Sequence, residues 1–426
     1  MHFDIPYGQS HLPLELPDHL VRGVLVPATE QLKTELSEDE IVRAALRTPI
    51  GSPSLGELAV GKQTACIIIS DHTRPVPSQR ILPWMLAELR AANPAIDITL
   101  LVATGFHRGT TPQELELKLG RQLAATEKIV VHDSADPSTI RSIGTLPSGA
   151  ELAICRVAVE TDLLLAEGFI EPHFFAGFSG GRKSVLPGVC SRQTVLGNHC
   201  GAFIASPYAR PGVLDGNPLH RDMLAAAKMA KLAFIVNVII DEQKKVVAAF
   251  AGDAIKAHRQ GCDYLKQFCQ VPAAPAEITI TSNGGAPLDQ NIYQAVKGMC
   301  AAEASAPKDG VIIMCAECLD GTGGEDFYRA LRDCPSAAEL FRRSSRIPMA
   351  ETEPDQWEAQ ILARIIAQHP VIFVTRPEMK GVITDMKMTW AGDLEEALAL
   401  ARGLKGAAAG ITVIPNGISV IVGASC

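Results

Sequence analysis

Continuous apolar runs alternate with amphipathic stretches along most of this chain. The segments ACIIISD (65–71) and DITLLVATG (97–105) are short, rich in β-branched residues and bounded by turn residues. Such runs are typical of strands that are buried on both faces. Between them, SQRILPWMLAELRAA (78–92) has apolar residues at helical spacing. The pattern therefore predicts a strand–helix–strand unit with two parallel strands.

The same alternation continues toward the middle of the chain. Further buried strands are expected at 128–133 and 162–168, a hairpin at 234–240 and 246–250, and helices at 111–120 and 253–268. Thr111 and Glu114 form a predicted capping box, with Pro112 in the first helical turn.

A Pro/Ala-rich linker, VPAAPAE (271–277), interrupts the pattern, which then restarts. Strands are expected at 277–284, 311–317 and 371–376, helices at 291–303, near 324–345, at 355–368 and at 393–404, and one or two strands within 411–423. The sequence thus predicts two α/β domains with mainly parallel sheets, an N-terminal domain at 1–270 and a C-terminal domain at 275–400.

Glycine-, histidine- and arginine-rich loops follow several of the predicted strands. They are SDHTRPVPS (70–78), TGFHRGTTP (104–112), GFIEPHFFAGFSGGRKS (168–184), SNGGAPLDQ (282–290) and ECLDGTGGED (317–326). Ligands of open α/β sheets bind outside the carboxyl ends of the strands. We therefore expect one active site in the cleft between the two domains.

Composition narrows the class of protein. The 426 residues are 47% hydrophobic and carry a formal charge of −8 without a basic block, which argues against a nucleic-acid partner. No apolar run is long enough to span a bilayer, and the N-terminus lacks the basic start and apolar core of a signal peptide, so a cytoplasmic protein without a membrane partner is expected. The 11 scattered cysteines are expected to be mostly buried thiols, and the C-x-x-C of Cys315 and Cys318 is a weak metal or redox signal.

The FSGGRKS segment (178–184) is suited to holding an anion. The backbone amides of Gly180 and Gly181 have no side chain in the way, and the Arg182 and Lys183 side chains are cationic. The spacing is not that of a nucleotide-binding P-loop, so ATP is not implied. A plain tight turn is the alternative interpretation.

Three of the 11 histidines lie in glycine-bearing loops of the expected site, namely His107, His173 and His199. Histidine moves protons near neutral pH or binds borderline metals, but these three lack the spacing of a zinc site. His72 and His132 are weaker candidates, and the remaining histidines are expected to be structural.

Charged groups on other elements complete the candidate site. Asp71 and Arg74 occur in SDHTRP, and Tyr293, Gln294 and Lys297 occur within one predicted helix, where Tyr293 and Lys297 share a face. Arg74 and Lys297 could bind a carboxylate or phosphate. An exposed helix side is the alternative for the second group.

Together these segments resemble the nickel-dependent lactate racemase family. The matching segments, in the family's order, are SDHTRPVPS, LVATGFHR, HFFAGFSGGRKSVLPG, the NH of GNHC, LDQNIYQAVKGM and DQW, with weaker similarity through IPMAETEPDQWEAQ and ITVIPNG. The resemblance implies that the tail, 405–426, returns to the N-terminal domain and that the two domains close over the site.

The resemblance also implies a cofactor, the nickel pincer nucleotide, a pyridinium-3-thioamide-5-thiocarboxylic acid mononucleotide that holds Ni²⁺. Lys183 matches the lysine that binds it covalently, and His199 matches the protein ligand to nickel. Gly180 and Gly181 lie in the matching cofactor loop. The positions around cofactor and substrate match Asp71, Arg74, Tyr293, Gln294, Lys297 and Trp357.

The implied activity is interconversion of D- and L-lactate. His107 and His173 match the two acid/base histidines, hydride moves reversibly from the substrate Cα to the cofactor, and pyruvate is the intermediate. The implied partners are a small 2-hydroxy acid and cofactor-biosynthesis proteins. A racemase or epimerase of another 2-hydroxy acid, such as malate, is the alternative enzyme, and a non-catalytic anion-binding protein is the alternative of another class. Cys200, beside His199, is a possible competing nickel ligand.

Overall fold

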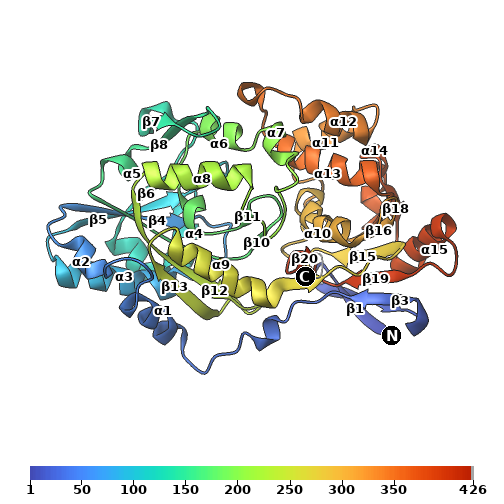
Figure 1. The fold of residues 1–426 in the computed structure, drawn as a ribbon, viewed down its shortest axis with the longest axis horizontal. Helices are drawn as coiled ribbons and strands as arrows, with labels where there is room; N and C mark the ends of the chain where they lie inside the picture. Colours follow the sequence, from blue (N-terminus) through green and yellow to red (C-terminus); the bar gives the residue numbers. More distant parts are fainter. Residues whose placement is uncertain (424–426) are drawn as a thin grey trace.

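A computed structural model describes residues 1–423, which form two six-stranded sheets (Figure 1). The first sheet has the strand order β13-β12-β9-β4-β5-β6. Its strands are β4 (Thr64–Ser70), β5 (Asp97–Ala103), β6 (Lys128–Val131), β9 (Leu163–Phe169), β12 (Leu232–Ile240) and β13 (Val246–Gly252). Only β13 runs antiparallel to its neighbour, because it forms a hairpin with β12, so the expected mainly parallel α/β sheet is confirmed.

Alternate residues of these strands face opposite layers of helices. Ile67 and Ile69 of β4 lie in an apolar cluster with α1, α2 and α3, whereas Ile68 packs in the cluster that includes α8. Burial on both faces explains why the strands read as continuous apolar runs. The helices of this part are α1 (Glu38–Arg47), α2 (Leu55–Ala59), α3 (Ser78–Ala92), α4 (Pro112–Thr126), α5 (Arg156–Glu160), α6 (Arg192–Asn198), α7 (Gly201–Ile204), α8 (Pro218–Met229) and α9 (Lys256–Cys269).

The second sheet has the order β18-β17-β16-β15-β19-β3 and is parallel throughout. Its strands are β3 (Val21–Val24), β15 (Ile278–Ser282), β16 (Val311–Cys315), β17 (Val371–Val374), β18 (Thr389–Ala391) and β19 (Ile411–Ile414). The helices of this part are α10 (Ile292–Ser305), α11 (Glu325–Arg332), α12 (Ala337–Ser344), α13 (Gln356–Gln368), α14 (Lys380–Asp385) and α15 (Leu394–Lys405). The helix α15 packs on one face of this sheet, and α10 packs on the other.

The two terminal segments of the chain join a different sheet from the one expected. Strand β19 of the tail does not return to the first sheet but lies between β15 and β3 in the second. All four residues of β19 are buried, so this apolar strand requires a neighbour on each side, and the N-terminal β3 supplies one of them. Residues 1–24 therefore belong with the C-terminal sheet, and the N-terminus lies on that side of the molecule in Figure 1. Residues 424–426 of the expected tail lie outside the described residues.

Several short elements escaped the sequence patterns. They are the paired strands β1 (His2–Tyr7) and β2 (Ser10–Glu15), β7 (Ile140–Thr145) and β8 (Glu151–Cys155), β10 (Pro172–His173) and β11 (Gly177–Phe178), and also β14 (Gln270–Pro272). The partner of β14 is β20 (Ile421–Gly423), the second of the strands expected within 411–423. In the part of the chain that the structure describes, no helix has the length and apolarity needed to cross a membrane.

The predicted helix at 111–120 ends at Gly120, where the backbone leaves the helical conformation. Gly120 has φ +78° and ψ 155°, outside helical values, although helical structure resumes and α4 extends to Thr126. The capping box of Thr111 and Glu114 is confirmed at its start.

A buried ion pair joins α10 to α13. Arg364 donates to both carboxylate oxygens of Glu303, at 2.8 and 2.7 Å, and the two side chains are only 4% and 11% exposed. Replacing Glu303 with glutamine leaves the guanidinium charge buried without its counterion, which is expected to lower the free energy of unfolding by about 3 kcal/mol. Urea unfolding measures this, with Glu325→Gln in the exposed Glu325–Arg329 pair as control. Equal, small effects of both changes would contradict the prediction.

Candidate active site

The candidate residues lie on loops and helices that follow the carboxyl ends of strands in both sheets. Asp71 and Arg74 follow β4, His107 follows β5, and the segment with His173 and Lys183 follows β9. His199 caps the end of α6. From the second sheet, the helix after β15 carries Tyr293, Gln294 and Lys297, and Trp357 lies in the first turn of α13.

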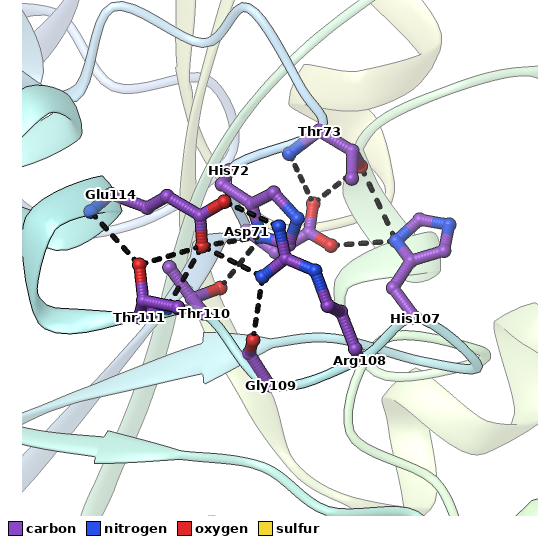
Figure 2. Close-up of polar contacts among 9 residues, drawn as sticks. All are labelled: Asp71, His72, Thr73, His107, Arg108, Gly109, Thr110, Thr111 and Glu114. Atoms are coloured by element: carbon purple, nitrogen blue, oxygen red, sulfur yellow. Dashed lines mark hydrogen bonds and ion pairs between the residues drawn. The ribbon is translucent and has the colours of Figure 1, made fainter. Parts of the chain in front are cut away.

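His107 is held by a buried carboxylate (Figure 2). Its Nδ1 lies 2.6 Å from Oδ2 of Asp71, and Thr73 donates from both its hydroxyl and its backbone N–H to the other oxygen, at 2.7 and 3.2 Å. Burial acts to raise the pKa of Asp71, but the hydrogen bond and charge of His107, with Thr73 and Arg74, hold this pKa below its usual value. The ionised carboxylate therefore accepts the Nδ1 proton of His107 and leaves Nε2 of the neutral ring as a proton acceptor.

The same loop is anchored to α4. Arg108 donates to both carboxylate oxygens of Glu114, at 2.8 and 2.5 Å, and the backbone N–H of Thr111 donates to Glu114 at 2.9 Å. Nδ1 of His72 lies 3.1 Å from the Thr110 hydroxyl (Figure 2). His72 is thus engaged in the loop, and the capping box has a second function, because it fixes the segment next to His107.

His173 lies in an aromatic environment. Its ring stacks on Phe174 with centroids 5.0 Å apart and meets the edge of Phe175 at 4.6 Å. The backbone N–H of Ala176 donates to Nδ1 at 3.3 Å, so Nε2 carries the proton of the neutral ring. Burial first, then the charges of Lys183 and Lys297, lower the pKa of His173 well below its usual value.

His199 has the form that a metal binds. Its Nδ1 donates to the Val195 carbonyl at 3.1 Å, which leaves Nε2 unprotonated. Burial and the charge of Lys183 lower the pKa of His199 to about 3, so the ring stays neutral. The rings of Phe175 and Trp357 lie 5.2 and 5.1 Å away. Within residues 1–423, no group of three or more His, Cys, Asp or Glu side chains is arranged to hold a metal.

The glycine pair before Lys183 serves a tight turn. Gly180 and Gly181 have φ of 79° and 53°, and a Cβ on Gly181 would lie 2.5 Å from the ring of His258. The amide of Gly181 donates to Asn237 at 2.7 Å. This amide is therefore engaged within the protein, contrary to the expectation that both glycine amides are open to an anion.

Arg182 also has partners inside the fold. It is 1% exposed and donates to the carbonyls of Ala176 and Phe178 at 2.7 and 2.8 Å and to Nδ1 of His220 at 3.0 Å. Arg182 therefore stabilises the loop and does not bind an anion. This corrects the expectation that its side chain helps to hold one. Lys183 remains as the cation of this segment.

The amine of Lys183 forms no hydrogen bond and no ion pair with any described residue, and its Nζ lies 5.9 Å from the centroid of the Phe175 ring. Burial first, and then the charges of Arg182 and Arg74, lower its pKa well below the usual value for lysine. A lysine in these surroundings has more of the neutral, nucleophilic amine at neutral pH.

Residues of the second domain lie beside the same site and contact side chains of the first domain. Nε1 of Trp357 donates to the hydroxyl of Tyr293 at 3.0 Å, and Nζ of Lys297 donates to Oε1 of Gln294 at 2.5 Å. Lys297 lies 5.8 Å from the ring of Phe174, and Trp357 meets the edge of Phe106 at 5.9 Å. These contacts join the two domains and exclude the alternative that the α10 residues form only an exposed helix side.

Arg74 is exposed, and its side chain forms no ion pair with any described residue. Its charge nevertheless acts on His173, Lys183 and Lys297. The structure therefore brings the basic side chains of Arg74, Lys183 and Lys297 near His173, and the charges of Arg74 and Lys297 suit a small anionic ligand.

Some side chains of the site had no signal of their own in the sequence. Thr73 and the three phenylalanines Phe106, Phe174 and Phe175 lie inside segments that were singled out for other residues. Glu358, which is fully buried, follows Trp357 directly. Spacing alone could not separate such residues from ordinary core positions.

The weaker candidates have structural environments. Nε2 of His132 lies 2.9 Å from the Cys190 carbonyl. Cys200 is buried, and burial raises the pKa of its thiol, so it stays protonated and is a poor competitor for a metal. Cys315 and Cys318 are buried, unpaired thiols, and burial raises the pKa of both.

Comparison with known proteins places this arrangement in a family. The family model described as the lactate racemase N-terminal domain matches residues 7–212, and that of the lactate racemase C-terminal domain matches residues 271–422. Two proteins named lactate racemase, from Thermoanaerobacterium thermosaccharolyticum and Lactiplantibacillus plantarum, are 54% and 51% identical over 98% of this chain and 98% and 99% of their own lengths. The structure of the lactate racemase apoprotein from Thermoanaerobacterium thermosaccharolyticum superposes with a TM-score of 0.96 at 53% identity, covering 99% of this chain and all of that one. The chain therefore belongs to the lactate racemase family of isomerases.

Proposed function

We propose that this protein interconverts D- and L-lactate by reversible hydride transfer at Cα, with pyruvate as the intermediate. The observation that carries the proposal is the pair of histidines in complementary hydrogen-bonding states. His107 presents an unprotonated Nε2, because its Nδ1 proton is held by Asp71, and His173 presents a protonated Nε2. In such a pair Nε2 of His107 removes the hydroxyl proton and the imidazolium so formed returns it, while the Nε2–H of the neutral His173 ring donates a hydrogen bond to the substrate oxygen.

The side chains present fit the nickel pincer nucleotide. Lys183 offers a half-buried amine without a protein partner for the covalent bond, and His199 offers a neutral ring with a free Nε2 for the metal. The loop turn at Gly180 and Gly181 directs Lys183 rather than providing two open amides. When bound, the cofactor supplies a carbon that accepts and returns hydride. We place its loading in the cytoplasm, by cofactor-biosynthesis proteins.

The chain's own residues bind the substrate and move its protons. Arg74 and Lys297 bind the lactate carboxylate, and Gln294 orients the Lys297 amine through their hydrogen bond. Nε2 of His107 takes the hydroxyl proton from one enantiomer, while His173 serves the opposite face. Asp71 stabilises the imidazolium that forms on His107. The packed aromatic rings of Phe174, Phe175 and Trp357 exclude water from the reacting atoms.

The loaded enzyme, incubated with single enantiomers of lactate and of malate, tests the proposal. We expect racemisation of lactate, with malate turned over much more slowly because Tyr293 and Trp357 hydrogen-bond to each other and restrict the space at the substrate side chain. In deuterated water the product should retain the hydrogen at Cα. Free exchange of that hydrogen with solvent would indicate a carbanion route, and faster turnover of malate would make malate the substrate.

A further inference from the structure

Helix α13 of the second domain contacts the segment of the first domain that carries His199. This segment consists of the end of α6, His199, Cys200 and the short helix α7. Figure 1 shows α7 beside α13, and a hydrogen bond and a ring contact join α13 to the segment. The proposed reaction has not yet used α7 or its hydrogen bond to α13.

Gln360 forms the polar contact between α13 and α7. Its side chain has no exposed surface, and its Nε2 donates to the carbonyl of Gly201 at 2.8 Å. The same Nε2 donates at 3.2 Å to the hydroxyl of Ser345, the residue that follows α12. The Oε1 of Gln360 has no hydrogen-bond partner among the described residues. The hydrogen bonds of this amide are therefore the two that it donates, and they join α7 to the end of α12.

The backbone of Gly201 lies close to the same part of the second domain. A Cβ at this position would collide with the carbonyl oxygen of Ser344 and would lie 3.2 Å from Nε2 of Gln356. Any residue larger than glycine would therefore push the end of α12 away from α7. The close approach and the hydrogen bond from Gln360 together fix the start of α7 against the second domain.

Trp357 contacts the ring of His199 from the same face of α13. Trp357 and Gln360 are three residues apart, so their side chains project from one face of the helix. The rings of Trp357 and His199 meet edge to face, with centroids 5.1 Å apart and an interplanar angle of 66°. The His199 ring also donates from Nδ1 to the carbonyl of Val195 at 3.1 Å. Contacts to α6 and to α13 therefore set the orientation of this ring together.

The hydrogen bond at Gly201 acts on His199 through the backbone. Only Cys200 separates the two residues, so their Cα atoms are at most about 7.6 Å apart. Cys200 is buried and extended, with φ −64° and ψ 155°, and it begins α7 directly after His199 ends α6. A displacement of Gly201 would therefore displace the His199 ring as well.

We infer that Gln360 is a positioning residue that holds the His199 ring in the orientation that binds the metal. It does so through the Gly201 carbonyl and makes retention of the metal depend on contact with the second domain. The inference rests on the proposed function insofar as that function assigns nickel to His199. Replacing a group that orients a metal-binding histidine typically weakens metal binding by about 10- to 100-fold.

Nickel release from the loaded protein tests the link to the metal. Gln360→Met keeps the length of the side chain but cannot donate to Gly201. In excess EDTA, with protein-bound nickel measured by metal analysis over time, this variant should lose nickel about tenfold faster than the wild type. Gln368→Met, at an exposed glutamine near the end of the same helix, is the control and should match the wild type. An unchanged release rate in Gln360→Met would overturn the link to the metal.

Chemical modification of the apoprotein tests the positioning without cofactor or activity. Diethyl pyrocarbonate modifies unprotonated imidazole, and the wild-type His199 is protected because its side chain is only 6% exposed. Peptide mass spectrometry should show about fivefold faster modification of His199 in Gln360→Met, as expected when one hydrogen bond is lost. Gly201→Ala, which collides at the same contact, should have the same effect. The rate at His132, which is 2% exposed and lies outside this contact, should not change.

Thermal melting identifies the folded variants, and the two substitutions make the test independent of either one folding. An unchanged rate at His199 in the folded variants would overturn the positioning role. Equal acceleration at His132 would also overturn it, because the fold would then have loosened as a whole. A loaded wild type that retains nickel but does not racemise lactate would overturn the proposed function alone.

Discussion

Lys183→Ala is expected to abolish racemase activity, because it removes the only amine proposed to bond to the cofactor. The wild-type protein, produced together with cofactor-biosynthesis proteins, should have an increased intact mass that maps to Lys183, and about one nickel per chain. The variant should show neither, although its loop should stay folded, since Gly181 and Arg182 form their contacts without the lysine side chain. Intact-protein mass spectrometry and metal analysis measure both effects.

Lys228→Ala is the matched control, since Lys228 is an exposed lysine on α8. It should retain the adduct and full turnover. An adduct on Lys183→Ala, or an adduct mapped to another lysine, would show that Lys183 does not anchor the cofactor.

His107→Ala is expected to reduce kcat for lactate racemisation by about 10³-fold, in the range for loss of a general base. The physical reason is that Nε2 of His107 is the proton acceptor that Asp71 prepares. Cofactor loading should be unaffected, because His107 lies on a different loop from Lys183 and His199, and the adduct mass of the variant checks this.

Asp71→Asn is a second variant that affects the same proton acceptor, with a smaller expected loss. An asparagine amide can donate to Nδ1 of His107, which would place the proton on Nε2 and block proton acceptance, so a loss of about 10²-fold in kcat is expected. His11→Ala, at an exposed histidine of the N-terminal hairpin, is the control and should be neutral. Intact turnover in His107→Ala would show that His107 is not the proton acceptor of the reaction.

The sequence predicted the two α/β sheets because buried parallel strands have a local signature. The helix at 78–92 has the predicted bounds, and β4, β5 and β9 begin within one residue of their predicted starts. Short or exposed strands lack that signature. In β3 the burial alternates between half-buried and exposed positions, so nothing in VRGV distinguishes it from a loop.

The assignment of the chain ends to a sheet was beyond the reach of local patterns. Strand β19 was expected from its apolar run, but its neighbours β15 and β3 are separated from it by more than 100 residues. The pairing is selected by burial of both faces and edges of the strand, which depends on the whole sheet.

The amino-acid sequence by itself determined the fold class, the capped helix beside His107 and the loops that carry the chemical groups, because periodicity, capping and turn chemistry act over a few residues. Only the tertiary structure decided how those groups are used. It engaged Arg182 and the Gly181 amide inside the loop, left the Lys183 amine without a protein partner, and gave His107 and His173 opposite hydrogen-bonding states. The reason is that burial and hydrogen-bond partners, which set charge and protonation, come from segments distant in the chain.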